Sequence, residues 1–132
     1  MSRLPRAQEY LKTGFTAEAA SAARFRAAAA RAQADGKPNL ARAWTELATE
    51  KDALAVRQLE AAGQVRGGGE DLAAALAEER YENDSLYPRM AREVDADTAA
   101  VLEGVAQKQR EHLARLESLL DALTRSSGDL PA

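Results

Sequence analysis

The sequence predicts an all-α protein that folds as a bundle of four helices. Its alanine-rich and charge-rich composition, with few β-branched residues, favours helix along most of the 132 residues. Apolar residues recur at alternating spacings of four and three in four separate stretches, which is the pattern of helices packed along a common seam. Turn-forming residues separate these stretches, and the chain is long enough for one domain with a four-helix core.

Glycine and proline set the limits of the first two helices. The first helix should span residues 7–34, or begin as late as Thr16, and the Gly36–Pro38 turn should end it. Glycine suits the left-handed position after a helix, and proline suits the first turn of the next one. The second helix should begin at Pro38 or Asn39 and run to Ala62, with Gly63 directly after its end.

The third helix should follow a glycine-rich linker, Gln64–Gly69. Acidic residues at Glu70 and Asp71 suit a helix start, because negative charge there complements the helix dipole. This helix should reach about Glu93 with a kink at Pro88, since proline lacks a backbone donor and crowds the preceding turn.

The fourth helix should be capped by Asp97 or Thr98 and should run to about Thr124. The bundle is therefore expected over residues 1–125, and the Ser- and Pro-containing tail, residues 126–132, is expected to be disordered.

Composition excludes several classes of protein. Without cysteine the chain forms no disulfide, iron–sulfur cluster, thiolate zinc site or rubredoxin centre. A net charge of −3, with both signs mixed along the helices, offers no basic face for nucleic acid. No stretch approaches the roughly 18 apolar residues of a membrane span. We expect a soluble, cytoplasmic protein that binds neither nucleic acid nor membrane.

Polar residues interrupt the centre of every seam. The seams are Leu11, Phe15, Glu18, Ala22, Phe25, Ala29 and Ala32; Leu40, Ala43, Leu47, Glu50 and Leu54; Leu72, Ala75, Glu79, Glu82 and Leu86; and Leu102, Val105, Gln109, His112, Leu116, Leu119 and Leu123. Four carboxylates, an amide and the only histidine would thus meet inside one bundle. Withdrawing like charges from water is costly unless they are protonated, hydrated or bound to a cation. The pattern therefore favours a metal site.

The spacing of these residues suits transition-metal chemistry. Glu79 and Glu82 are three apart and share one helix face, as do Gln109 and His112. Imidazole with carboxylates suits iron, manganese or zinc, and carboxylates can bridge two cations. The alternative is a bundle without metal, in which the carboxylates are hydrated or protonated and His112 is a hydrogen-bonded core residue.

Three stretches of the sequence resemble a known family. They are Phe15–Ala22, Ala48–Ala53 and Glu79–Pro88, the last of which carries a Glu-x-x-Glu motif followed by a Leu-Tyr-Pro tripeptide. The chain resembles the four-helix domain of the rubrerythrins, in the ferritin-like superfamily, over nearly all of residues 10–123. The resemblance implies a ferritin-like bundle whose metal ligands are Glu18, Glu50, Glu79, Glu82 and His112.

Two positions depart from the rubrerythrin pattern. Ala53 stands where the resemblance implies a histidine, and Gln109 stands where it implies a bridging glutamate. The loss of a bridging carboxylate should weaken one position of a dinuclear iron site and leave Glu50, Glu79 and His112 as a set sufficient for one ion. Glu18 and Glu82 would complete the coordination of that ion or hold a weaker second ion, so one or two iron ions are expected. Tyr81 is expected to pack, or to hydrogen-bond a ligand carboxylate.

The resemblance implies peroxide or oxygen chemistry at non-haem iron, with manganese or zinc as other candidate metals. No catalytic residue is expected beyond the metal ligands. Since the rubredoxin module of the family is missing, a peroxidase of this kind would need an external redox partner. The alternative is a catalytically silent ferritin-like bundle that serves as a metal-binding or protein-interaction scaffold.

The length of the linker between the second and third helices limits how the four helices can be connected. A second helix of about 24 residues is roughly 36 Å long, whereas the seven residues from Gly63 to Gly69 span at most about 25 Å. One chain therefore cannot make the long ferritin-like connection. Either the four helices run up-down-up-down in a monomer, or a homodimer exchanges helical hairpins by domain swapping. Resemblance to short-linker rubrerythrins favours the dimer.

Overall fold

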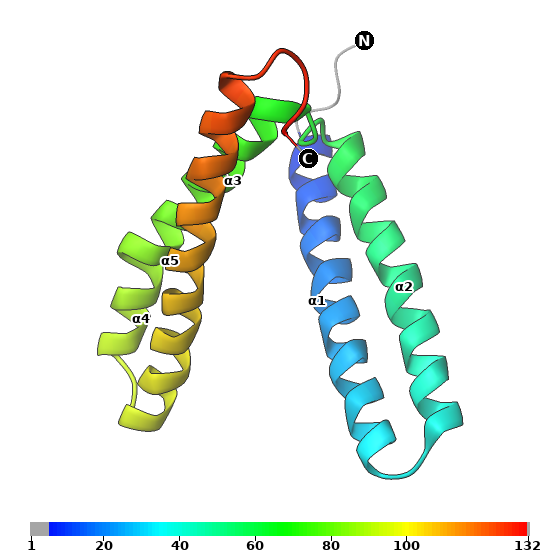
Figure 1. Cartoon of the computed structure of the whole chain (residues 1–132). Coiled ribbons are helices and arrows are strands. Elements are labelled where there is room, and N and C mark those ends of the chain that lie inside the picture. The colour runs from blue at the N-terminus through cyan, green and yellow to red at the C-terminus, as the bar shows by residue number, and fades with distance from the viewer. Residues whose placement is uncertain (1–5, 132) are drawn as a thin grey trace. The chain divides into compact units, whose positions relative to one another are not determined.

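The computed structural model describes residues 6–131 and is helical over most of this range. The described chain forms two helical hairpins, one ending at Val65 and one beginning at Arg66 (Figure 1). Each hairpin has its own packing, and no strand occurs among residues 6–131. The prediction of an all-α protein with four helices is therefore confirmed for this part of the chain, with the third helix interrupted.

The first hairpin pairs α1 (Ala7–Ala34) with α2 (Pro38–Ala61). Gly36 has a φ of +73°, and the Lys37 N–H donates to the carbonyl oxygen of Ala32 at 2.9 Å across the helix end. This is the left-handed glycine cap that the sequence predicts. Gly63 closes α2 in the same way with a φ of +72°.

Small residues form the contact between α1 and α2. The buried residues of this hairpin are all alanines: Ala22, Ala32, Ala41, Ala48, Ala55 and Ala62. On α2 they recur every seventh position, so they lie along one side of the helix. The rings of Phe25 and Trp44 pack with centroids 5.0 Å apart, and the Gln8 amide donates to the Ala62 carbonyl oxygen at 2.6 Å.

The α2 seam predicted from the leucine spacing lies one position away from this alanine face. Leu40, Leu47 and Leu54 are 47%, 45% and 46% exposed within the hairpin. Because the alanine face contacts α1, these leucines form a separate apolar stripe along α2. We call Leu40, Leu47 and Leu54 the leucine stripe.

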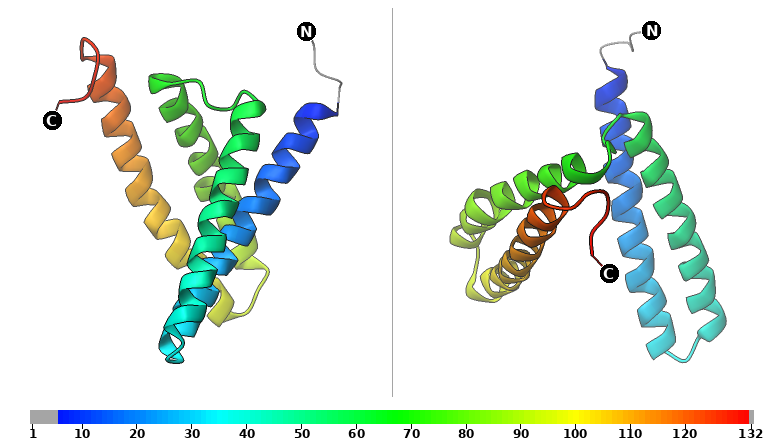
Figure 2. Two further views of the ribbon diagram at one scale, coloured as in Figure 1. Left: turned by 90° about the vertical axis from the view of Figure 1, so that its right-hand side faces the viewer. Right: turned by 45° about the horizontal axis from the view of Figure 1, so that its top comes forward.

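The second hairpin pairs an interrupted helix with one continuous helix. Its elements are α3 (Gly68–Tyr81), the π-helical turn η1 (Glu82–Leu86), α4 (Tyr87–Arg92) and α5 (Ala96–Thr124). The right-hand view of Figure 2 shows α5 alongside α3 and α4, with which it packs. Ahead of α3, the Asp71 carboxylate accepts the backbone N–H groups of Arg66 and Gly67, each at 2.8 Å. These hydrogen bonds lower the pKa of Asp71 below its ordinary value.

The interruption differs from the predicted kink at Pro88. The helix widens earlier, over Glu82–Leu86, and the Tyr87 N–H donates to the carbonyl oxygen of Glu82, five residues back. A proline cannot donate to the helix ladder and crowds the carbonyl four residues before it, and a widened turn accommodates that disturbance. The helix then ends at Arg92, one residue before the expected limit.

The cap of α5 is also different from the predicted one. Asp95, and not Asp97 or Thr98, is the N-cap, and its Oδ1 accepts the Thr98 N–H at 2.7 Å. The Thr98 hydroxyl donates to the other carboxylate oxygen at 3.0 Å. Asp95 takes this role because its backbone is extended (φ −66°, ψ 168°), as an N-cap requires, whereas Asp97 and Thr98 already lie inside the helix.

Beyond α5, residues 125–131 leave the helix, and the Ser126 hydroxyl donates to the Leu123 carbonyl oxygen at 3.0 Å. The disorder expected for residues 126–132 stays a prediction, and Ala132 lies outside the described residues. Among the helices of the described chain, none combines the length and apolarity needed to cross a membrane.

The Asp95 cap should stabilise α5 in a pH-dependent way. Hydrogen bonds from the backbone and hydroxyl of Thr98 lower the pKa of the Asp95 carboxyl. A group whose pKa is lower in the folded state stabilises above its unfolded pKa, about 3.9, and loses that contribution as the pH falls through its folded pKa. Asp95→Ala should therefore lower the melting temperature at pH 7, and this loss should shrink below about pH 4.

The measurement is thermal melting followed by circular dichroism at several pH values. Asp97→Ala is the matched control, because Asp97 lies in the same first turn but is not the cap. Equal losses for the two variants at pH 7 would show that the cap contributes nothing of its own.

Candidate metal-binding site

Glu79 and His112 face each other across the second hairpin. Glu79 lies on α3, and its Oε1 is 3.4 Å from Nδ1 of His112 on α5. The Glu79 side chain is 23% exposed and that of His112 is 53% exposed. The sequence predicts that the polar residues at the seam centres converge, and the structure brings these two side chains together.

Glu82 and Gln109 form the next pair along the same hairpin. The Gln109 amide donates to Oε1 of Glu82 at 2.6 Å. Gln109 is buried, and Glu82 lies in the first position of η1. Because the Gln109 side chain is a neutral amide that can donate, it hydrogen-bonds the Glu82 carboxylate and fixes its position, whereas a glutamate at this place would repel it.

Three buried oxygens lack a hydrogen-bond partner among the described residues, and all three belong to predicted site residues. They are Oε2 of Glu18, Oε2 of Glu79 and Oε1 of Gln109. An unpartnered buried acceptor is costly, and native proteins rarely leave one without a reason. Carboxylate and amide oxygens beside an imidazole are ligands that a divalent cation accepts. The chemistry of these side chains therefore fits a metal ion.

The first hairpin places Glu18 and Glu50 differently. Oε2 of Glu18 lies 2.7 Å from Nζ of Lys51, close enough for an ion pair although not in hydrogen-bond geometry. Glu50, the neighbour of Lys51, is exposed on α2. Within this hairpin, Glu18 is therefore paired with a lysine and not with Glu50.

No three His, Asp or Glu side chains of residues 6–131 come together as a metal-binding cluster. The second hairpin holds two polar pairs, Glu79 with His112 and Glu82 with Gln109. The first hairpin holds Glu18 beside Lys51. The two positions that depart from the rubrerythrin pattern also differ in burial, since Ala53 is exposed and Gln109 is buried. Tyr81 is 56% exposed.

Sequence reasoning did not single out Lys51 or Asn83. Asn83 is buried, and its amide donates to the Ala106 carbonyl oxygen at 2.6 Å, which ties η1 to α5. Its signal in the sequence is the run Asn83–Ser85 just before Pro88, whose residues are weak helix formers. Lys51 has no comparable signal, because only the register of α1 against α2 brings it to Glu18.

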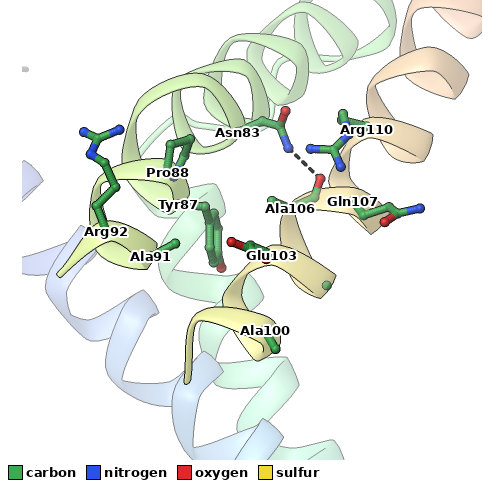
Figure 3. A pocket seen from close by; sticks show the side chains of 11 residues that line it. Asn83, Tyr87, Pro88, Ala91, Arg92, Ala100, Glu103, Ala106, Gln107 and Arg110 are labelled. Carbon is green, nitrogen blue, oxygen red and sulfur yellow. Dashed lines mark hydrogen bonds between the residues drawn. The ribbon is translucent and has the colours of Figure 1, made fainter. Parts of the chain in front are cut away.

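Two cavities lie along the second hairpin. One, of about 380 Å³, is lined by Glu79 and His112 together with Ala75, Arg115, Leu116 and Leu119. A larger one, of about 680 Å³, lies around α4 and the start of α5. Figure 3 shows Asn83 reaching toward Ala106 there, with Tyr87 and Glu103 nearby. Only the smaller cavity adjoins predicted metal ligands, so it is the one relevant to the candidate site.

A scan against protein-family models finds no match, and a search of curated proteins finds no significant similarity.

Proposed function

We propose that this chain binds one divalent metal ion, iron or manganese, through Glu79 and His112. The observation that carries the proposal is the buried Oε2 of Glu79, which has no hydrogen-bond partner and belongs to a carboxylate beside an imidazole. A neutral imidazole nitrogen and a carboxylate oxygen are typical ligands of these metals. Zinc fits the same ligands.

The remaining ligands are proposed from the sequence pattern. Glu82, on the same hairpin, would add a further carboxylate to the coordination, as the resemblance to rubrerythrins implies. The Gln109 amide would hold the Glu82 carboxylate in place through its hydrogen bond. Leu116 and Leu119 line the same hollow and would form an apolar wall beside the ion.

The proposed activity is reduction of peroxide, or reaction with oxygen. Reduction of hydrogen peroxide to two waters takes two electrons and two protons. A single Fe²⁺ ion held by Glu79 and His112 would supply one electron on becoming Fe³⁺, so the reductant would supply the second electron as well as the one that returns the iron to Fe²⁺. Because the chain has no cysteine for a thiolate-bound electron carrier, a separate redox partner would restore those electrons. Consumption of hydrogen peroxide by the iron-loaded protein with a chemical reductant tests this part of the proposal. A rate no greater than that of a His112→Ala chain would contradict it.

A silent scaffold is the second candidate function. The internal contacts favour it, because Glu18, Glu79 and Glu82 each lie beside a basic or amide group of the chain itself. Under this reading the polar residues stabilise the hairpins without a metal. It predicts that no metal raises the melting temperature.

Metal binding should stabilise the protein by mass action. At a metal concentration 100 times its dissociation constant, the gain is about 2.7 kcal/mol, or roughly 10 °C for a domain of this size. Glu79→Gln and His112→Ala should remove most of this shift with Fe²⁺, Mn²⁺ or Zn²⁺. The matched control is Glu78→Gln, which makes the same chemical change at the exposed neighbouring position. No shift for the parent chain with any of these ions would refute the site.

We also propose that the protein is a homodimer. The leucine stripe supports this, because three exposed leucines at seven-residue spacing form the kind of face that packs against another helix. Light scattering at micromolar concentration should give twice the mass of one chain, and Leu47→Glu should shift that mass toward the monomer. A strictly monomeric parent chain would rule the dimer out.

A further inference from the structure

The larger cavity of the second hairpin, about 680 Å³ in volume, is lined by residues of η1, α4 and α5. Asn83 and Ala106, joined by a hydrogen bond, are its buried lining residues (Figure 3). Gly104 lines it too, and a Cβ atom built on Gly104 would meet no other atom within 4 Å. Small-molecule sites typically have volumes of about 300–1,000 Å³, so the space is large enough for an organic ligand.

This cavity is separate from the candidate metal site. Glu103, in its lining, and His112 are both on α5 and are nine residues apart. At about 3.6 residues per turn, this separation is two and a half turns, so the two side chains leave the helix on opposite sides. No residue lines both this cavity and the one beside Glu79. A ligand bound here would therefore not depend on a metal ion.

Most polar side chains of the larger cavity have no partner within the chain. Asn83 is hydrogen-bonded, but five others find neither a hydrogen bond nor an ion pair among residues 6–131: Tyr87, Arg92, Glu103, Gln107 and Arg110. Elsewhere on this hairpin, Arg80, Lys108 and Arg125 lie 2.7, 3.2 and 2.7 Å from carboxylate oxygens. The cavity thus gathers charged groups that the chain itself leaves unpaired.

The spacing on α5 explains why these charges stay unpaired. Gln107 lies four residues after Glu103 and three residues before Arg110, at the positions where a helix pairs opposite charges. Because Gln107 is neutral, neither charged group finds its usual neighbour. Glu103 and Arg110 themselves are seven residues apart, which is about two turns and too far for a direct pair.

The charges indicate the chemistry of a ligand. A guanidinium group binds carboxylates and phosphates, to which it offers several donors in one plane. In Figure 3, Arg92 and Arg110 lie on opposite sides of the cavity, with Tyr87 and Glu103 between them. A ligand that uses both arginines therefore carries an acidic group at each end. An ionised carboxylate such as that of Glu103 only accepts hydrogen bonds, so the middle of the ligand should carry donors such as hydroxyl groups.

We propose that this cavity binds a hydroxylated organic dianion. Its two acidic ends pair with Arg92 and Arg110, and its hydroxyl groups donate to Glu103. Sugar diacids and sugar bisphosphates share this chemistry, the first with carboxylate ends and the second with phosphate ends. The proposal does not rest on the metal site, since the two cavities share no residue.

Calorimetric titration of the full chain with three compounds that have carbon chains of equal length tests this chemistry. Glucarate has both acidic ends and hydroxyl groups, adipate has only the acidic ends, and sorbitol has only the hydroxyl groups. Glucarate should bind once per chain, adipate should bind about tenfold more weakly, and sorbitol should not bind. Fructose bisphosphate is titrated in parallel, and the tighter of the two dianions identifies the preferred acidic group.

Substitutions tie the binding to this cavity. Arg92→Gln and Arg110→Gln should each weaken binding of the tighter dianion about tenfold or more, because each removes a charge-assisted contact. Arg89→Gln is the matched control, since Arg89 is exposed on the same helix as Arg92 and does not line the cavity. Glu103→Gln should reduce the preference for glucarate over adipate. Gly104→Leu should abolish binding by filling the cavity, while the helix is kept because leucine is a better helix former than glycine.

Circular dichroism checks that each variant folds. Amide resonances of residues 87–92 and 103–107 in two-dimensional nitrogen–proton spectra should shift when the dianion is added. The proposal is overturned if neither glucarate nor fructose bisphosphate binds below about 10 mM, or if Arg89→Gln weakens binding as much as Arg92→Gln. It is also overturned if a folded Gly104→Leu chain binds as well as the parent. Equal affinity for glucarate and adipate would overturn the role of Glu103 and the hydroxylated class of ligand.

Discussion

A carboxylate that is withdrawn from water requires a positive or hydrogen-bonding partner, and this requirement governs the polar centre of both hairpins. Glu18 and Glu79 each have one buried oxygen without a hydrogen bond within the described chain. The first lies beside an ammonium group and the second beside an imidazole. An uncompensated buried charge costs several kcal/mol, so each carboxylate lies where such a partner is within reach.

Helix packing places these partners. In the first hairpin α2 packs against α1 through its alanine face, and Lys51 lies on the side of this contact. The leucine stripe takes no part in the contact and is exposed within the hairpin. In the second hairpin the π-helical turn allows the helix to pass Pro88, and Asn83 ties that turn to α5. A π-helical turn of this kind is often found at functional sites, and here it begins at Glu82, one of the candidate ligands.

The helix limits could be predicted because glycine and proline mark them, as Gly36 and Gly63 show by their positive φ angles. The pairing of Glu79 with His112 could be predicted from equal spacings on two amphipathic helices. The pairing of Glu18 with Lys51 could not be predicted in this way. The leucines and the alanines of α2 form two apolar faces one position apart, and spacing alone favours the leucine face for the contact with α1. The structure uses the alanine face, and this register brings Lys51 to Glu18. Two further features could not be predicted from the sequence: the widened turn before Pro88 and the use of Asp95 as the N-cap. Each depends on backbone geometry that several neighbouring residues could have adopted.

The central claim is that Glu79 and His112 hold one divalent ion in the protein as the cell makes it. Elemental analysis tests this most directly, on protein purified without added metal and without chelators, beside a His112→Ala chain prepared in parallel. The account predicts about one ion of iron, manganese or zinc per parent chain, and far less in the variant. A parent chain that carries no metal, and takes up none when incubated with Fe²⁺ or Mn²⁺, would contradict it.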